Sequence, residues 1–224
     1  LSATMPFTAK AQDKVEASVG ADFVSNYIWR GTDCGGVSIQ PSMGVSYKGL
    51  SLTAWGSVGI DKEDAREIDL TLGYNTGGFS VSVTDYWFSY HKEDGGYTGD
   101  YFKYGAHSTV HIFEATLGYD FGPLALSWNT YFAGDDYTKE NGDRAYSTYV
   151  GISAPFKLGG LDWSAEVGLT PWEGAYANKF NVTNLTLKAE KEIKFTNSFS
   201  LPTFAQVTFN PHTQGAYFVF GVSF

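Results

Sequence analysis

Apolar and polar residues alternate with a period of two along most of the chain. Between Val37 and Tyr47, for example, every second residue is apolar, and the residues between them are Ser, Gln or Gly. This alternation is typical of a β-strand with two different faces, and no segment shows a convincing helical period. The pattern predicts twelve strands, with boundaries uncertain by roughly two to four residues. They cover residues 14–30, 36–48, 51–61, 66–75, 79–90, 109–120, 124–134, 144–156, 161–170, 180–192, 199–210 and 214–224.

The connections between these strands fall into two classes that alternate along the chain. One class consists of tight turns, most of them containing Gly: "YKGLS", "YNTGGFS", "YDFGPLALS", "FKLGGLDWS" and "IKFTNSFS". The other class is more polar and often longer: "GTDCGG", "DKEDA", "HKEDGGYTGDYFKYGAHS", "GDDYTKENGD", "PWEGAYANKF" and "PHTQG". Short turns at one end and longer loops at the other are typical of bacterial outer-membrane barrels. The alternation therefore predicts such a barrel, with both termini on the periplasmic, short-turn side.

The chemistry of the polar face indicates which side of the sheet faces outward. That face consists mostly of Ser, Thr and Gly, whereas a convex surface in water would carry many Lys and Glu side chains. Small side chains suit a concave interior, so we expect the apolar face to be convex and to contact lipid. In hydrocarbon every backbone polar group must be paired within the protein, so the sheet must close. The sequence thus predicts an all-β fold: a single antiparallel transmembrane β-barrel of about 12 strands. Leu52, Val58, Leu126 and Val167 should then face outward, and Ser42, Thr71 and Ser127 inward.

Composition excludes several other classes of protein. The chain has 224 residues, 26 of them Gly, and a formal charge of −9 with a pI near 4.8. An acidic protein of this kind is not expected to bind nucleic acid, which requires a basic face. No apolar run approaches the 18 or so residues that a spanning helix requires.

The first residues predict export. "LSATMPFTAKAQDK" is apolar with small residues, and Ala9-Lys10-Ala11 fits an A-x-A cleavage site. We therefore expect residues 1–11 to be the remnant of a signal peptide and residues 12–224 to form the outer-membrane β-barrel. The alternative is a disordered N-terminal extension. Cys34 is the single cysteine, so no internal disulfide is expected and the hydrogen-bonded sheet must supply the stability.

Four stretches carry a resemblance to a known family. "DFVSNYIWRG" (22–31), "QPSMGVSYKGLSLTAWGS" (40–57), "SLPTFAQVTFNP" (200–211) and "YFVFGVSF" (217–224) resemble the TorF-like family of porins of bacterial outer membranes. The resemblance covers most of the chain after residue 11 and is weakest in residues 91–108. It implies an outer-membrane location and a barrel fold, and it brings no catalytic residues with it.

Strand parity places eight acidic and three basic side chains on the inward face. These predicted lumen-lining residues are Glu16, Asp22, Asp61, Asp69, Glu114, Asp162, Glu166 and Glu190, with Arg30, Lys48 and Lys188. An excess of carboxylates favours cations in a pore. The alternative is a filled lumen, braced by a charge network of Lys188, Glu190, Glu16 and Lys48. Large inward side chains would narrow any channel: Trp55, Tyr86, Phe88, Tyr131, Tyr149, Phe204 and Tyr217.

Other candidate chemistry is weak. His107 and His111 would lie roughly 13 Å apart along a strand, too far to share a metal ion. Ser108 follows His107, but adjacent strand residues point to opposite faces, so they form no nucleophile and base. We expect no enzyme activity and no cofactor.

The loop "GDDYTKENGD" has enough oxygen atoms for Ca²⁺ but lacks the spacing of a calcium loop, so a solvated acidic loop is favoured. Cys34 is expected to be a free thiol, with lipidation or a bridge to another chain as alternatives.

These observations favour a narrow passive channel in the bacterial outer membrane for small polar or cationic solutes. The expected partners are outer-membrane lipid and those solutes. The alternative is a non-conducting structural or accessory barrel that supports a larger assembly with other outer-membrane proteins.

Overall fold

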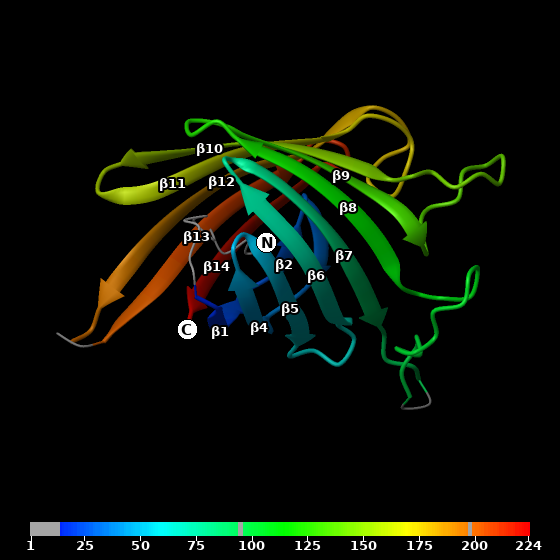
Figure 1. Ribbon diagram of the computed structural model, residues 1–224, viewed down its shortest axis with the longest axis horizontal. Coiled ribbons are helices and arrows are strands. Elements are labelled where there is room, and N and C mark those ends of the chain that lie inside the picture. The colour runs from blue at the N-terminus through cyan, green and yellow to red at the C-terminus, as the bar shows by residue number, and fades with distance from the viewer. Residues whose placement is uncertain (1–13, 94–95, 197–198) are drawn as a thin grey trace.

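The computed structural model describes residues 14–93, 96–196 and 199–224, and the predicted signal-peptide remnant, residues 1–11, lies outside them. In the described residues, twelve antiparallel strands form a closed barrel in the order β1-β14-β13-β12-β11-β10-β9-β8-β7-β6-β5-β4 (Figure 1). The barrel strands are β1 (Glu16–Val24), β4 (Ser38–Tyr47), β5 (Leu50–Gly59), β6 (Arg66–Thr76), β7 (Phe79–Ser89), β8 (Ile112–Asp120), β9 (Ala125–Gly134), β10 (Thr148–Leu158), β11 (Leu161–Thr170), β12 (Asn181–Lys194), β13 (Ser200–Asn210) and β14 (Gly215–Ser223). No helix in these three ranges is long and apolar enough to cross a membrane.

One predicted strand differs from the structure. The alternation over residues 14–30 predicts a single strand, but β1 ends at Val24, and β2 (Tyr27–Trp29) pairs instead with β3 (Thr32–Gly35). The chain reverses at Arg30 and Gly31, which both have positive φ. A two-residue hairpin turn of this type follows the twist of its strands. A period of two does not distinguish a wall strand from such a hairpin, which explains the difference.

The two classes of connection lie at opposite ends of the barrel, as the sequence predicts. In Figure 1 the β10–β11 turn lies at the left and the longer β9–β10 connection at the right. Three of the short turns are two-residue turns with positive φ, at Lys48–Gly49, Gly77–Gly78 and Gly159–Gly160. Glycine adopts this conformation without steric cost.

The barrel is apolar outside and polar inside. Leu52, Val58, Leu126 and Val167 are 52%, 50%, 38% and 40% exposed. Ser42, Thr71 and Ser127 are half-buried on the opposite face, and Ser38, Gln40 and Ser57 are buried there. The predicted orientation of the sheet is therefore confirmed. An outward apolar surface on a closed barrel is compatible with a membrane location.

The barrel closes where the first and last barrel strands meet. Asp22, Phe23 and Val24 of β1 pair with residues 221–223 of β14. Ala21 and Phe224 extend this seam, because each backbone N–H donates to the other residue's carbonyl, at 3.2 and 2.9 Å. Closure gives both edge strands a partner, as a sheet in an apolar environment requires.

Candidate functional site in the lumen

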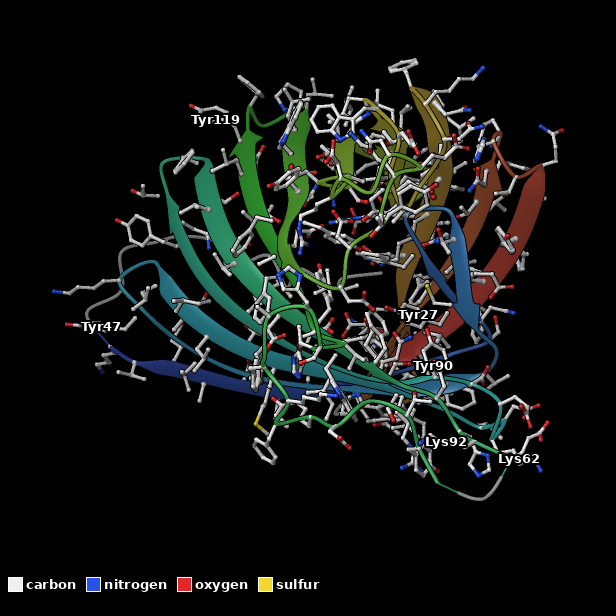
Figure 2. All side chains as sticks on the ribbon, turned by 90° about the vertical axis from the view of Figure 1, so that its right-hand side faces the viewer. Tyr27, Tyr47, Lys62, Tyr90, Lys92 and Tyr119 are labelled. Carbon is white, nitrogen blue, oxygen red and sulfur yellow. The ribbon has the colours of Figure 1, made fainter. Side chains whose placement is uncertain are left out.

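The β2–β3 hairpin lies inside the ring of strands. Ile28 packs with Val24, Phe204 and Val219 on one side of the interior. Arg30 reaches Glu114 of β8 on another side. In Figure 2, which faces the loop end, Tyr27 lies within the outline of the barrel, whereas Tyr47 and Tyr119 lie at its edge. A connection that the sequence assigns to a wall strand and a surface loop therefore occupies the lumen.

The tip of the hairpin fits closely against the wall. A Cβ added to Gly31 would lie 1.9 Å from the carbonyl oxygen of Thr183, so only glycine allows this approach. The side-chain amide of Asn210 donates a hydrogen bond of 3.0 Å to the carbonyl oxygen of Gly31. These contacts attach the tip to β12 and β13.

Arg30 forms a two-pronged ion pair with Glu114. Its Nη1 and Nη2 atoms lie 2.5 and 2.9 Å from the two carboxylate oxygens, and Nη1 also donates to the Tyr176 hydroxyl at 2.6 Å. Glu114 is 1% exposed, so the pair is shielded from solvent. Burial alone would lower the pKa of the Arg30 guanidinium, but Glu114 outweighs this effect, and the pKa lies well above its ordinary value. Arg30 is therefore a fixed positive charge in the lumen.

Aromatic rings surround this ion pair. The Arg30 guanidinium lies 4.3 Å from the ring centre of Trp29 and 4.8 Å from that of Tyr149, distances at which a cation is attracted to a ring face. The cluster of buried rings comprises Tyr86, Tyr131, Tyr149 and Tyr176, with Trp29 and Phe88 packed against it. Burial raises the pKa of Tyr176 to about 12, so its hydroxyl stays neutral beside the guanidinium. Tyr149 and Tyr176 thus flank the cation, whereas Tyr86 and Tyr131 hydrogen-bond to its partners Glu114 and Tyr176; we call these four tyrosines the box.

A second anchor holds the base of the hairpin. Tyr27 is hydrogen-bonded to Glu67 and packs against Trp55 with 5.6 Å between ring centres. Glu67 and Asp69 lie two residues apart on β6 and are both buried. Among the described residues, no hydrogen-bond partner reaches the Oδ1 atom of Asp69. The hairpin therefore lies against a wall that carries more carboxylates than cations.

The predicted lumen-lining residues occupy three different environments. Arg30, Asp69 and Glu114 lie in the interior beside the hairpin, although Arg30 reaches it from the hairpin tip and not from a wall strand. Asp22, Glu166 and Lys188 are half-buried. Glu16, Lys48, Asp61, Asp162 and Glu190 are exposed.

Four of the five exposed members lie at or just beyond a strand end, where alternation no longer fixes which way a side chain points, and Glu190 pairs with Asp162 at the start of β11. Lys48 belongs to a two-residue turn, and Asp61 follows the end of β5. Asp162 pairs with Lys157 at 2.6 Å, with both side chains more than 60% exposed. Of the predicted charge network, the Lys188–Glu190 pair is present at 2.5 Å, with the Glu190 side chain 55% exposed.

Glu67 and Tyr176 of the site are missing from the sequence-based set, as is Trp29 of the hairpin. Glu67 has the same strand parity as Asp69, so the alternation contains the signal that would have identified it. Tyr176 lies in the connection between β11 and β12, where no periodicity exists, and only the folded chain brings it to Arg30.

A separate cluster lies at the loop end, on the outward side of β7 and β8. His111 is fully buried, with its Nδ1 atom 2.6 Å from Asp85 and its Nε2 atom 2.7 Å from the carbonyl oxygen of Tyr101. Tyr101 and Tyr104 pack against the imidazole ring. These contacts attach the β7–β8 connection to the wall, which accounts for His111 structurally.

The acidic loop between β9 and β10 uses its oxygen atoms within itself. Asp136 accepts hydrogen bonds from the backbone N–H groups of Tyr137 and Ser147, and Asn141 donates to Asp143. Across the described residues, no group of three or more His, Cys, Asp or Glu side chains is arranged to hold a metal ion.

No protein-family model matches the chain, and no curated protein matches it.

Proposed function

We propose that the protein is a β-barrel of the bacterial outer membrane, with periplasmic termini, that conducts small cationic solutes once the β2–β3 hairpin leaves the lumen. The proposal is based on the position of the hairpin. This connecting segment lies inside the barrel and fills the loop-side half of the lumen. The short-turn half is lined by small half-buried hydroxyl side chains such as Ser42, Ser51 and Thr71. Movement of one hairpin would therefore change the width of the lumen.

The acidic side chains of the wall support cations as the solutes. Glu67, Asp69 and Glu114 are buried on β6 and β8, and Arg30 of the hairpin forms the ion pair with Glu114. When the hairpin leaves, its guanidinium leaves with it, and the wall keeps its carboxylates. Inward carboxylates favour cations in a pore.

A non-conducting accessory barrel is the second candidate. It is favoured by the buried ion pair and the two apolar clusters, which together hold the hairpin in place. In this proposal the hairpin stabilises the barrel permanently, and outer-membrane partner proteins bind the loops or the outer wall. The resemblance to the TorF-like family is compatible with both candidates.

Single-channel recording in planar bilayers separates the two candidates. We expect rare or narrow openings from the unaltered protein and frequent larger ones when residues 26–36 are replaced by a short Gly-Ser linker. Replacing residues 138–144 of the β9–β10 connection in the same way serves as the control for loop shortening. In the hairpin-replaced barrel, Asp69→Asn combined with Glu114→Gln should reduce the preference of the channel for cations. If the folded hairpin-replaced barrel stays silent, the channel proposal is wrong and the accessory barrel is favoured.

A further inference from the structure

We propose that Glu114 and the four tyrosines Tyr86, Tyr131, Tyr149 and Tyr176 form a binding site for guanidinium-type organic cations, and that Arg30 occupies this site as a built-in competitor. The inference rests on the proposed function only in naming these cations as solutes of the channel. The binding site itself is a property of the folded wall.

The carboxylate of Glu114 is held in position to receive a planar fork of donors. The Tyr86 hydroxyl donates a hydrogen bond of 3.0 Å to its Oε1 atom. Both carboxylate oxygens then face the two guanidinium nitrogens of Arg30. A guanidinium matches this two-pronged geometry, whereas the ammonium of a lysine side chain acts as a point charge.

The aromatic part of the site also belongs to the wall and to one neighbouring connection. Tyr86, Tyr131 and Tyr149 come from β7, β9 and β10, and Tyr176 comes from the β11–β12 connection. Tyr176 is positioned by Tyr131, to whose hydroxyl it donates at 3.1 Å. The hairpin contributes only the ligand, Arg30, and the ring of Trp29 on which the guanidinium lies. Removal of the Arg30 side chain therefore leaves the receiving groups in place.

The backbone conformation of Arg30 indicates that the contacts of its side chain, and not the geometry of the turn, account for an arginine at this position. Arg30 has φ of +50°, at the first central position of a turn that Asn, Asp or Gly usually fills. A non-glycine residue is disfavoured in this conformation. The contacts of the guanidinium offset that cost, which fits a residue whose function is to fill the box.

A tethered competitor sets the range of concentration at which free cations bind. A group attached by a short segment acts at an effective concentration in the millimolar range. A solute must exceed this competition to displace Arg30, and it would thereby release the hairpin. The barrel with the hairpin docked in the lumen would therefore open in response to the same cation that the channel conducts.

The first test measures binding directly in the Arg30→Ala variant of the full chain, folded in detergent. Isothermal titration calorimetry with ethylguanidinium should show saturable binding, and urea, a neutral molecule of similar shape to guanidinium, should show none. Adding Glu114→Gln should weaken ethylguanidinium binding about tenfold or more, because a charge-assisted pair is lost. Arg30→Lys should leave the box partly occupied and bind ethylguanidinium more weakly than Arg30→Ala does. Absence of binding in a correctly folded Arg30→Ala barrel would overturn the proposal.

The second test uses the unaltered protein and the half-buried thiol of Cys34 in β3 as a reporter of hairpin release. Millimolar ethylguanidinium should accelerate alkylation of Cys34, whereas urea or sodium chloride at the same concentration should not. If ethylguanidinium binds and accelerates alkylation but no variant conducts, the cation site stands and the channel proposal fails. If the hairpin-replaced barrel conducts but ethylguanidinium changes neither readout, the channel stands and the cation site is refuted.

Discussion

Arg30 and Glu114 show what strand parity predicts at the scale of single residues. Both are predicted to face the lumen, and both do. They are 84 positions apart in the chain, and alternation contains no information about which inward side chains meet. The ion pair arises because β2 and β3 turn back into the interior, which the alternation over residues 14–30 does not reveal.

Cys34 gives a prediction about pH. Burial, followed by the nearby Glu67 carboxylate, raises the pKa of the Cys34 thiol from an ordinary value near 9 to about 12. Because the thiolate is the reactive form, alkylation at pH 9 should be about a hundredfold slower, or more, than that of a thiol of ordinary pKa. The undocked thiol ionises first, so docking of the hairpin should weaken as the pH rises from about 9 towards 12.

The control for this measurement moves the thiol within the same hairpin. In the double variant Cys34→Ser with Thr32→Cys, the thiol occupies an exposed position of β3. The alkylation rate of this variant should follow an ordinary thiol pKa. Equal rates and equal pH profiles for the two proteins would contradict the raised pKa of the Cys34 thiol.

At the scale of elements, the decisive feature is the β2–β3 hairpin. Its two-residue turn has the same backbone form as the Lys48–Gly49, Gly77–Gly78 and Gly159–Gly160 turns, which connect wall strands. What distinguishes it is the contact of its tip with Thr183 of β12 and Asn210 of β13 in the barrel wall. Local turn chemistry is therefore the same, and long-range packing decides where the hairpin lies.

Gly31→Ala tests this packing. The new Cβ would clash with the Thr183 carbonyl oxygen, so we expect the tip to leave the wall while the twelve-stranded barrel stays closed. Cys34 should then be alkylated about tenfold faster or more, in a protein that keeps the heat-modifiable gel mobility of a folded barrel. The alkylation rate of Cys34 thus reports release of the hairpin in Gly31→Ala, as it does in the ethylguanidinium experiment.

Gly142→Ala is the matched control. Gly142 has φ of +85° in the β9–β10 connection, and a Cβ there would have no atom within 4 Å. Alanine at either glycine carries the same order of conformational cost, about 1–2 kcal/mol. An unchanged Cys34 rate in Gly31→Ala, or an equal increase in Gly142→Ala, would show that close contact at the tip is not what holds the hairpin.

At the scale of the whole molecule, the outward apolar face determines how the barrel relates to its surroundings. Leu70 and Leu72 of β6 point outward and are 38% and 53% exposed, while Thr71 between them faces the interior. This face is the basis for the proposed membrane location, because it would be unfavourable in water and favourable in hydrocarbon.

Leu70→Arg should destabilise the barrel folded in lipid bilayers by about 2–4 kcal/mol, the cost of a charge on the lipid face near mid-bilayer. Thr71→Arg, at the adjacent inward position, should have a clearly smaller effect, since its charge lies in the lumen. Denaturant titration of both variants in lipid vesicles measures the difference. A larger effect at Thr71 than at Leu70 would contradict the assigned lipid face.

The sequence by itself determined the all-β class, the twelve barrel strands, the alternation of short and long connections and the side of the sheet that faces outward. Each of these follows from local rules: the period of two, the turn residues and the size of the side chains along one face. The tertiary structure alone decided that the first long connection enters the lumen, that Arg30 meets Glu114 and that Tyr176 completes the box. These contacts join residues that are distant in the chain, and they depend on closure of the barrel and on a close approach of Gly31 to the wall, which no local pattern records.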